Sequence, residues 1–196
     1  MATPVATDDR YTSDRYFHLV DDGVLGPDDR VELLDGVIVA MAPSGPLHAT
    51  ATTKAARALV VAIADRACVR VQSPLVAGSQ SVPEPDLAVV AGTPDDYRDA
   101  HPAAALLVVE VADSSLPQDR ITKTRIYATA RVPEYWILNL RDDCVEVLRA
   151  PDPQARSYGE RRVARRGERL DLGALPGVSV AVDDLLPSRR EPGTAP

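Results

Sequence analysis

The chain has 196 residues, 45% of them hydrophobic and 26% charged, which fits one globular domain with its own core and excludes a coiled coil, a collagen-like fibre or disorder throughout. Its net charge of −7 excludes a basic coat for nucleic acid, but it leaves room for an enzyme that touches nucleic acid locally with the help of a metal ion. Two cysteines, no CxxC pair, no apolar run of about 18 residues and an N-terminus unlike a signal peptide favour a reduced, cytoplasmic setting with no membrane partner.

The N-terminal third of the chain predicts a helix, a hairpin and a second helix. Thr12 offers the cap of a short amphipathic helix. Asp35-Gly36 stands between two apolar runs, and this pair is a strong signal for a tight β-hairpin. The Ala-rich segment 47–66 carries apolar residues at helical spacing and is therefore predicted to be a helix.

The remaining segments predict several strands and one further helix. Residues 104–111 form an apolar run with Glu110 near its end, which is typical of a strand buried on both faces. Other strands are predicted at 69–71 with 75–76, at 82–90, at 134–140, at 144–148 and at 161–164, and a helix at 117–130. This order predicts a single α/β (α+β) domain over residues 11–187, with a central mixed sheet and extra β-hairpins, between flexible tails at 1–10 and 188–196.

Asp86 and Glu110 are the first candidates for chemistry, because each stands at the end of an apolar strand. Asp86 opens the run 87–90, and Glu110 closes the run 104–109. A charge in a buried run is costly unless it is paired or binds a metal, and hard cations such as Mg²⁺ take carboxylate oxygens. We therefore expect the two acids to converge on one ion. For either acid alone, a turn cap or an exposed strand end is an equally good interpretation.

Lys123 is the third candidate. It follows Asp119 by four residues on the predicted helix, so both side chains lie on one helix face. Such a spacing normally indicates a surface ion pair. However, 20 of the 22 basic residues are arginine, and this position keeps a lysine, whose compact charge can release its proton. Lys123 is therefore a candidate to act beside a metal, with Glu32 as a further acid from an apolar run.

Six segments in a fixed order carry a resemblance to a known family. They are Glu32-Leu-Leu-Asp-Gly36, Met41-Ala-Pro-Ser-Gly-Pro-Leu-His48, Pro85-Asp-Leu-Ala-Val-Val90, Leu107-Val-Val-Glu-Val111 with Ser114-Ser115, Asp119-x-x-x-Lys123-x-x-x-Tyr127 and Val132-Pro-Glu-Tyr-Trp-Ile137. Together they resemble the Uma2 family, which is similar to the PD-(D/E)XK nucleases. The resemblance spans about residues 11–187. It implies a restriction-endonuclease-like mixed β-sheet flanked by helices, with one metal-dependent active site.

The resemblance implies a role for each candidate. Asp86 matches the aspartate of the PD pair, and Glu110 matches the second acid. The lysine that usually stands two residues after the second acid is replaced here by Ala112, and the following helix supplies it as Lys123. Asp86 and Glu110 would hold Mg²⁺ (or Mn²⁺) with the carbonyl of Val111, and the reaction would be phosphodiester hydrolysis in nucleic acid, with DNA as the expected substrate.

Two further residues match the family segments. Glu32 matches the acid of its segment and would reach the metal through a water molecule. His48 matches the histidine that follows, although a histidine near a helix start is more often a structural hydrogen-bonding residue than a catalyst. Asp113 is a departure, because the family often has a serine at this point, and an added acid here would either repel a phosphate or bind a second metal.

Several alternatives stay open. The six arginines within residues 156–169 either contact a DNA backbone or, as the favoured interpretation, form a solvated edge strand. The whole domain is either a metal-dependent endonuclease or a non-catalytic binding or regulatory module of the same fold. Hydrolysis of a smaller phosphoester is a third hypothesis and is less favoured. Apolar edges at 134–148 also suggest a homodimer.

Overall fold

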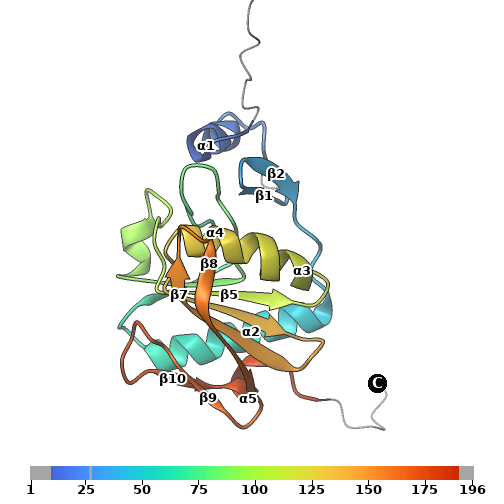
Figure 1. The fold of residues 1–196 in the computed structure, drawn as a ribbon. Coiled ribbons are helices and arrows are strands. Elements are labelled where there is room, and N and C mark those ends of the chain that lie inside the picture. Colours follow the sequence, from blue (N-terminus) through green and yellow to red (C-terminus); the bar gives the residue numbers. More distant parts are fainter. Residues whose placement is uncertain (1–9, 27, 190–196) are drawn as a thin grey trace, which may run out of the picture.

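The computed structural model describes residues 10–26 and 28–189. At its centre is a six-stranded sheet in the spatial order β3–β4–β5–β6–β7–β8 (Figure 1). Its strands are β3 (Cys68–Val71), β4 (Leu87–Val90), β5 (Leu107–Ala112), β6 (Glu134–Asn139), β7 (Cys144–Asp152) and β8 (Ser157–Arg165). Neighbouring strands are antiparallel except β5 and β6, which run parallel. The predicted mixed sheet of an α+β domain is confirmed.

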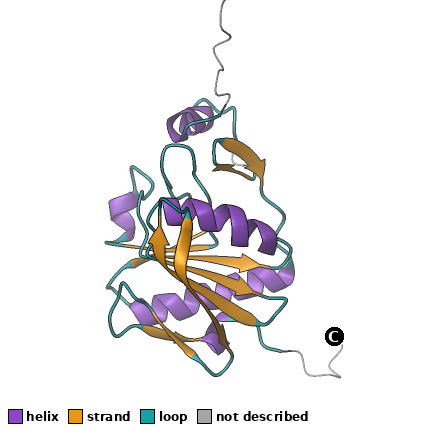
Figure 2. Cartoon of the chain, viewed as in Figure 1, coloured by secondary structure: helices purple, strands orange, loops and turns teal. Residues whose placement is uncertain are grey.

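Helices cover both faces of this sheet (Figure 1, Figure 2). The parallel pair β5–β6 needs a crossover connection, and this connection lies on one face as α3 (Leu116–Gln118), the π-helical turn η2 (Asp119–Lys123) and α4 (Thr124–Thr129). The other face carries α2 (Pro46–Ile63), the small hairpin of β9 (Arg169–Asp171) and β10 (Ser179–Ala181), and α5 (Val182–Leu185). The sheet is therefore the middle of three layers.

Side chains of β5 alternate between the two faces, as they must in a strand buried on both sides. Val109 and Val111 pack in the apolar cluster that contains α2, whereas Val108 and Ala112 pack in the cluster that contains α4. Glu110 lies between Val109 and Val111, so its carboxylate points to the α4 face. The alternation thus places a buried acid beneath the crossover connection.

The predicted hairpin is formed by β1 (Val31–Leu34) and β2 (Val37–Ala40), which pair outside the central sheet. Asp35 and Gly36 both have positive φ, 47° and 81°, as the type I′ turn of a two-residue hairpin requires. Leu33 bridges to Val82 in the segment that leads into β4. The hairpin is thereby held over the start of β4, next to the α4 face.

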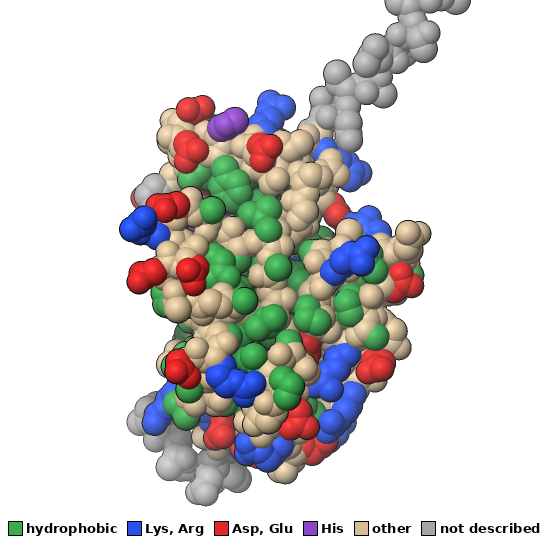
Figure 3. Space-filling view, turned by 90° about the vertical axis from the view of Figure 1, so that its left-hand side faces the viewer, with side chains coloured by type: hydrophobic (Ala, Val, Ile, Leu, Met, Phe, Trp, Pro, Cys, Tyr) green, Lys and Arg blue, Asp and Glu red, His purple; other side chains and the backbone are tan. Residues whose placement is uncertain are grey.

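The helix α1 (Ser13–Asp21) begins as predicted at Thr12, whose hydroxyl accepts the N–H of Arg15 at 3.2 Å. A hollow of about 800 Å³ lies between α1 and residues 97–101, and Figure 3 shows hydrophobic side chains gathered on this face of the molecule. Phe17 stacks on His101 there, with ring centroids 5.6 Å apart. This hollow meets the cavity described below only at Glu84.

The structure differs from the predicted elements at several points. The expected strand at 75–76 is irregular, β4 begins only at Leu87, and a short 3₁₀ helix (Pro94–Tyr97) lies in the predicted loop. Residues 134–148 form β6 and part of β7 inside the sheet, so the apolar edge on which the dimer expectation rested is buried within the monomer. Most of the two predicted tails lies outside the described residues. Among the described helices, none is long and apolar enough to span a membrane.

Candidate active site

An acidic cavity of about 310 Å³ opens on the α4 face of the sheet. It lies between the β1–β2 hairpin, the start of α2, the segment before β4, the end of β5, and η2. The five side chains proposed from the sequence all line it: Glu32, His48, Asp86, Glu110 and Lys123. Val111, the expected carbonyl ligand, lines it as well. The structure therefore brings together every residue of the predicted site.

Asp86 is held between the sheet and α2. Its Oδ2 atom accepts a hydrogen bond from the backbone N–H of Val111 at 2.8 Å and lies 3.1 Å from Nε2 of His48. The side-chain amide of Gln72 approaches Oδ1 at 3.4 Å. The hydrogen bond to Asp86 raises the pKa of His48, against the opposing effect of burial. His48 thus fixes the carboxylate from the helix side.

Glu110 is the floor of the cavity and is only 3% exposed. Its Oε1 atom accepts from Nζ of Lys123 at 3.0 Å and from the hydroxyl of Tyr127 at 2.6 Å. The same ammonium lies 3.3 Å from Oε2 of Glu32, which also accepts the backbone N–H of Glu84 at 3.1 Å. Lys123 therefore joins the hairpin to the central sheet.

The electrostatics of this pair follow from burial and charge. Burial raises the pKa of Glu110 to about 8. The ammonium of Lys123 acts in the opposite direction, but the other acids around the group raise the pKa further. Burial alone would lower the pKa of Lys123, but the carboxylates of Glu110, Glu32 and Asp119 outweigh it and raise the pKa. The lysine therefore stays charged, and burial holds the pKa of its partner Glu110 well above that of an exposed glutamate.

The alternative interpretation of Lys123, a surface ion pair with Asp119, is wrong. Asp119 is 2% exposed and Lys123 6% exposed, and the lysine bonds to acids of other elements. Asp119 instead lines the cavity and accepts from the hydroxyl of Ser115 at 2.7 Å. Burial raises its pKa to about 6. Asp119 is thus a site residue that sequence reasoning missed.

A four-residue spacing carries the signal that could have revealed Asp119. Ser115, Asp119, Lys123 and Tyr127 all make polar contacts at the cavity or its floor. In a regular α-helix, each step of four residues rotates a side chain by about 40°, which would spread the four over a broad arc. The wider turn η2 offsets this drift. Tyr127 points inward and donates its hydroxyl to Glu110.

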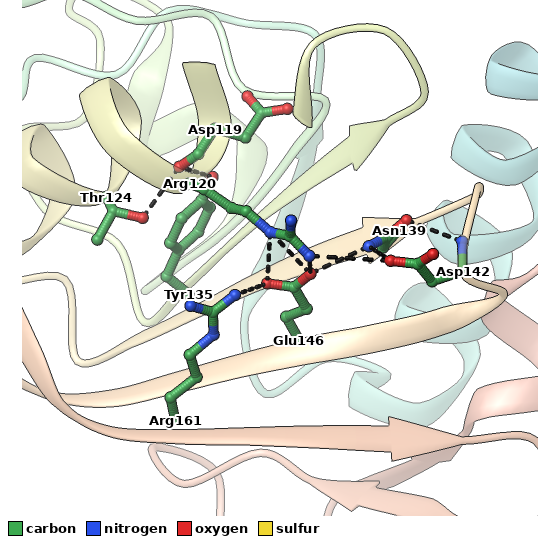
Figure 4. Close-up of polar contacts among 8 residues, drawn as sticks. All are labelled: Asp119, Arg120, Thr124, Tyr135, Asn139, Asp142, Glu146 and Arg161. Atoms are coloured by element: carbon green, nitrogen blue, oxygen red, sulfur yellow. Dashed lines mark hydrogen bonds and ion pairs between the residues drawn. The ribbon is translucent and has the colours of Figure 1, made fainter. Parts of the chain in front are cut away.

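The π-helical turn has its own supports, drawn in Figure 4. The carbonyl of Asp119 accepts from the backbone N–H and the hydroxyl of Thr124, the latter at 2.9 Å, and from the hydroxyl of Tyr135 at 3.2 Å. On the side away from the cavity, Arg120 bonds to both carboxylate oxygens of Glu146 on β7. The turn that carries Asp119 and Lys123 is therefore anchored to the sheet.

The arginine-rich segment is largely neutralised within the protein. It spans β8, the edge strand that was favoured for it, from Arg156 just before that strand to Arg169 at the start of β9. Its partners are Asp35 for Arg156, Glu146 for Arg161, Glu168 for Arg162, Asp143 for Arg166 and Ser179 for Arg169. Asp113, the departure from the family pattern, lies at the rim of the cavity, 3.8 Å from Arg141. Neither the arginine-rich segment nor the contact of Asp113 with Arg141 places an unpaired cation in the acidic cavity.

The donor chemistry of the cavity suits a hard cation, because its walls carry carboxylate oxygens and the Val111 peptide. The acids that line the cavity outnumber its bases. These acids are Glu32, Glu84, Asp86, Glu110, Asp113 and Asp119. Within the described part of the chain, however, no three His, Cys, Asp or Glu side chains stand in a ready metal-ligating arrangement. Lys123 occupies the space between two of the acids, so a metal would have to displace part of this pairing.

The mixed sheet, with acids at the ends of its central strands and helices on both faces, defines a restriction-endonuclease-like α+β domain. A family model described as "Putative restriction endonuclease" matches residues 14–183, and the chain belongs to that family, Uma2, as its motifs predict. Among solved structures, a "putative nuclease belonging to DUF820" from Anabaena variabilis ATCC 29413 is 14% identical with a TM-score of 0.67, covering 89% of this chain and 96% of its own. That likeness shows the fold. A search of curated proteins found no match.

Proposed function

We propose that the protein is a divalent-metal-dependent endonuclease that hydrolyses phosphodiester bonds of nucleic acid, with DNA as the expected substrate. One observation carries the proposal: a fully buried glutamate, Glu110, forms the floor of an acidic cavity with the ammonium of Lys123 3.0 Å away. Family membership supports the reaction class. A buried acid with a pKa of about 8 is costly for stability, and such groups cluster at functional sites.

The residues divide the work by chemistry. Asp86 and Glu110, with the carbonyl of Val111, would hold Mg²⁺ or Mn²⁺; when bound, the ion supplies positive charge at the phosphate and acidifies a water molecule. The backbone N–H of Val111 and the ring of His48 keep Asp86 in place. Lys123 donates hydrogen bonds into the cavity, where it orients the attacking water or stabilises the developing negative charge.

Glu32 acts through Lys123 in this proposal. Its carboxylate lies 3.3 Å from the ammonium and is fixed by the N–H of Glu84. If Glu110 held a metal, Glu32 would remain as a partner for the lysine. His48 is a positioning residue for Asp86, because its ring contacts the carboxylate rather than standing free in the cavity.

A second candidate function rests on the same cavity. Lys123 bridges Glu110 and Glu32, and the described residues offer no preformed set of three metal ligands. These two facts favour a non-catalytic module in which the cluster stabilises the fold. The two candidates differ in one respect: only the endonuclease needs a metal at Asp86 and Glu110. Cytoplasmic location and dimerisation stay predictions.

The nuclease proposal is tested by incubating the protein with duplex DNA, single-stranded DNA and RNA in Mg²⁺ or Mn²⁺. We expect wild type to cut at least one of them, and Asp86→Asn and Glu110→Gln to lose the activity. Glu168→Gln serves as the matched control, because this glutamate pairs with Arg162 on the exposed edge. Cleavage that survives in both acid variants, or that is absent from wild type with every substrate and metal, contradicts the proposal.

A further inference from the structure

The acidic cavity continues into a second, larger hollow of about 690 Å³, here called the side cavity. Five residues line both: Arg30, Met41, Ser44, Gln72 and Glu84. Each volume falls within the roughly 300–1,000 Å³ range of small-ligand sites. A ligand that has its reacting group above Glu110 therefore has a continuous path into the side cavity.

The walls of the side cavity suit a flat, partly apolar group. Helix α2 contributes short side chains, Ala49, Thr53 and Ala56, while Met41 and Val71 add apolar surface. Short side chains leave room close to the helix backbone. Methionine makes favourable contacts with aromatic rings through its sulfur, and every nucleobase offers such a ring face. The volume and these walls leave room for one nucleoside.

Charge decides where the phosphate of such a ligand would be held. Among the Lys and Arg side chains, Lys123 and Arg30 line the acidic cavity. The Lys123 ammonium is already bonded to Glu110 and Glu32. Arg30 is exposed, and within residues 10–26 and 28–189 it makes no ion pair. A phosphate that enters this acidic surrounding needs a free cation, and arginine matches phosphate with paired N–H donors.

Arg30 also stands at a fixed point of the backbone. Its carbonyl accepts the N–H of Met41 at 2.8 Å, which closes the base of the β1–β2 hairpin. Its guanidinium lies near enough to Glu84 to lower the pKa of that carboxyl, although burial raises it overall. The side chain is therefore anchored at its backbone, free at its charged end, and located at the junction of the two cavities.

We infer that Arg30 binds a phosphate of the nucleic-acid chain, and that the side cavity holds the nucleoside next to the bond that is cut; this inference rests on the proposed function. Arg30 thus supplies a phosphate contact in addition to Lys123, whose ammonium is already bonded to Glu110 and Glu32. The strand runs from the metal-binding acids past Arg30 and along the N-terminal half of α2.

The test measures binding rather than cleavage. A fluorescein-labelled oligonucleotide, single-stranded in one arm and duplex in the other, is titrated by fluorescence anisotropy with Ca²⁺ in place of Mg²⁺, at several salt concentrations. We expect Arg30→Gln to weaken binding about fivefold to tenfold and to reduce the slope of log affinity against log salt by roughly 0.7–0.9, the share of one phosphate contact. Arg30→Lys keeps part of the affinity.

Two further variants make the test specific. Arg57→Gln removes an exposed arginine of α2 that lies outside both cavities, so its affinity and salt slope should match wild type. Ala49→Leu fills the side cavity from an exposed helix position and should weaken binding without changing the salt slope.

The outcomes separate the two levels of the account. If Arg30→Gln binds as tightly as wild type, or if Arg57→Gln loses as much affinity as Arg30→Gln, the role of Arg30 is overturned and the nuclease proposal stands. Wild-type protein that binds none of the oligonucleotides overturns the inference; if the cleavage assay is also negative, the proposed function falls with it.

Discussion

Two buried glutamates on one face of the sheet have pKa shifts in opposite directions. Glu110 and Glu146 are both cross-strand partners of Ile137, so they lie in one row on either side of it. They are 3% and 1% exposed. Burial acts on both, yet the pKa of Glu110 is raised to about 8, whereas hydrogen bonds from Arg120, Asn139 and Arg161 outweigh burial and lower the pKa of Glu146.

The difference lies in the number of charged donors. Glu146 receives hydrogen bonds from two arginines and an amide, and Figure 4 shows them converging on its carboxylate. Glu110 has one ammonium, which it shares with Glu32, and one tyrosine hydroxyl. A fully satisfied carboxylate fastens the π-helical turn to the sheet. An under-satisfied carboxylate keeps affinity for a proton or a cation, which is the property a metal site needs.

The largest effect is expected when the satisfied cluster is broken. Glu146→Ala leaves Arg120 and Arg161 without their shared partner and should destabilise the protein by about 3 kcal/mol, the lower end of the cost of breaking a buried ion pair, because the two arginines are 37% and 53% exposed and stay partly hydrated. Glu168→Ala, at the exposed pair with Arg162, should cost at most about 1 kcal/mol. Urea unfolding monitored by circular dichroism measures both. Equal losses in the two variants would contradict the contrast.

Substitution of Glu110 is expected to stabilise the protein at high pH, whereas substitution of Glu146 destabilises it. Its folded pKa of about 8 lies above the unfolded value of 4.5, so the stability contributed by its proton is fully present below pH 4.5 and is lost as pH rises through about 8. Glu110→Gln should therefore match wild type near pH 4.5 and be more stable by roughly 2–4 kcal/mol at pH 9. The 3.5 pKa units between 4.5 and about 8 correspond to about 5 kcal/mol at about 1.4 kcal/mol each, and the loss of a partner for Lys123 offsets part of this gain. A variant less stable than wild type at pH 9 would refute the raised pKa.

Substitution of Lys123 is expected to change a free energy, that of activation, by a smaller amount. If Lys123 serves hydrolysis, Lys123→Arg should lower the metal-dependent rate at least about tenfold, or roughly 1.4 kcal/mol of barrier, because the planar guanidinium is larger than the compact ammonium that fits between Glu110 and Glu32. The fold should remain intact by circular dichroism. Full activity in Lys123→Arg would mean that the charge alone matters at this position.

A chemical probe sharpens the same comparison. The chain has only two lysines, Lys54 and Lys123. Acetylation of amines followed by mass spectrometry should label Lys54 on α2 and spare the buried Lys123. In Glu146→Gln, which loosens the anchor of the π-helical turn, labelling of Lys123 should rise severalfold while that of Lys54 stays constant. A parallel rise at both lysines would indicate global unfolding rather than a local role.

The sequence predicts the parts of this site that depend on neighbouring residues. Asp35-Gly36 predicts the hairpin because the turn needs positive φ, and Asp86 and Glu110 are noticed because each interrupts or borders an apolar strand. It does not predict what depends on packing between distant segments. The pairing of Lys123 with Glu110, the burial of Asp119 and the bond of Arg120 to Glu146 follow from a π-helical turn and a strand register that no local pattern encodes.

The central claim is that the under-satisfied acids form a metal site, and isothermal titration calorimetry with Mn²⁺ tests it most directly. Wild type should bind at one site, about 25-fold more tightly at pH 8.5 than at pH 6.5, because the proton of Glu110, with its pKa of about 8, must leave. Asp86→Asn should abolish binding, and Glu168→Gln should leave it unchanged. No binding by wild type at either pH, or equal binding by Asp86→Asn, would contradict the account.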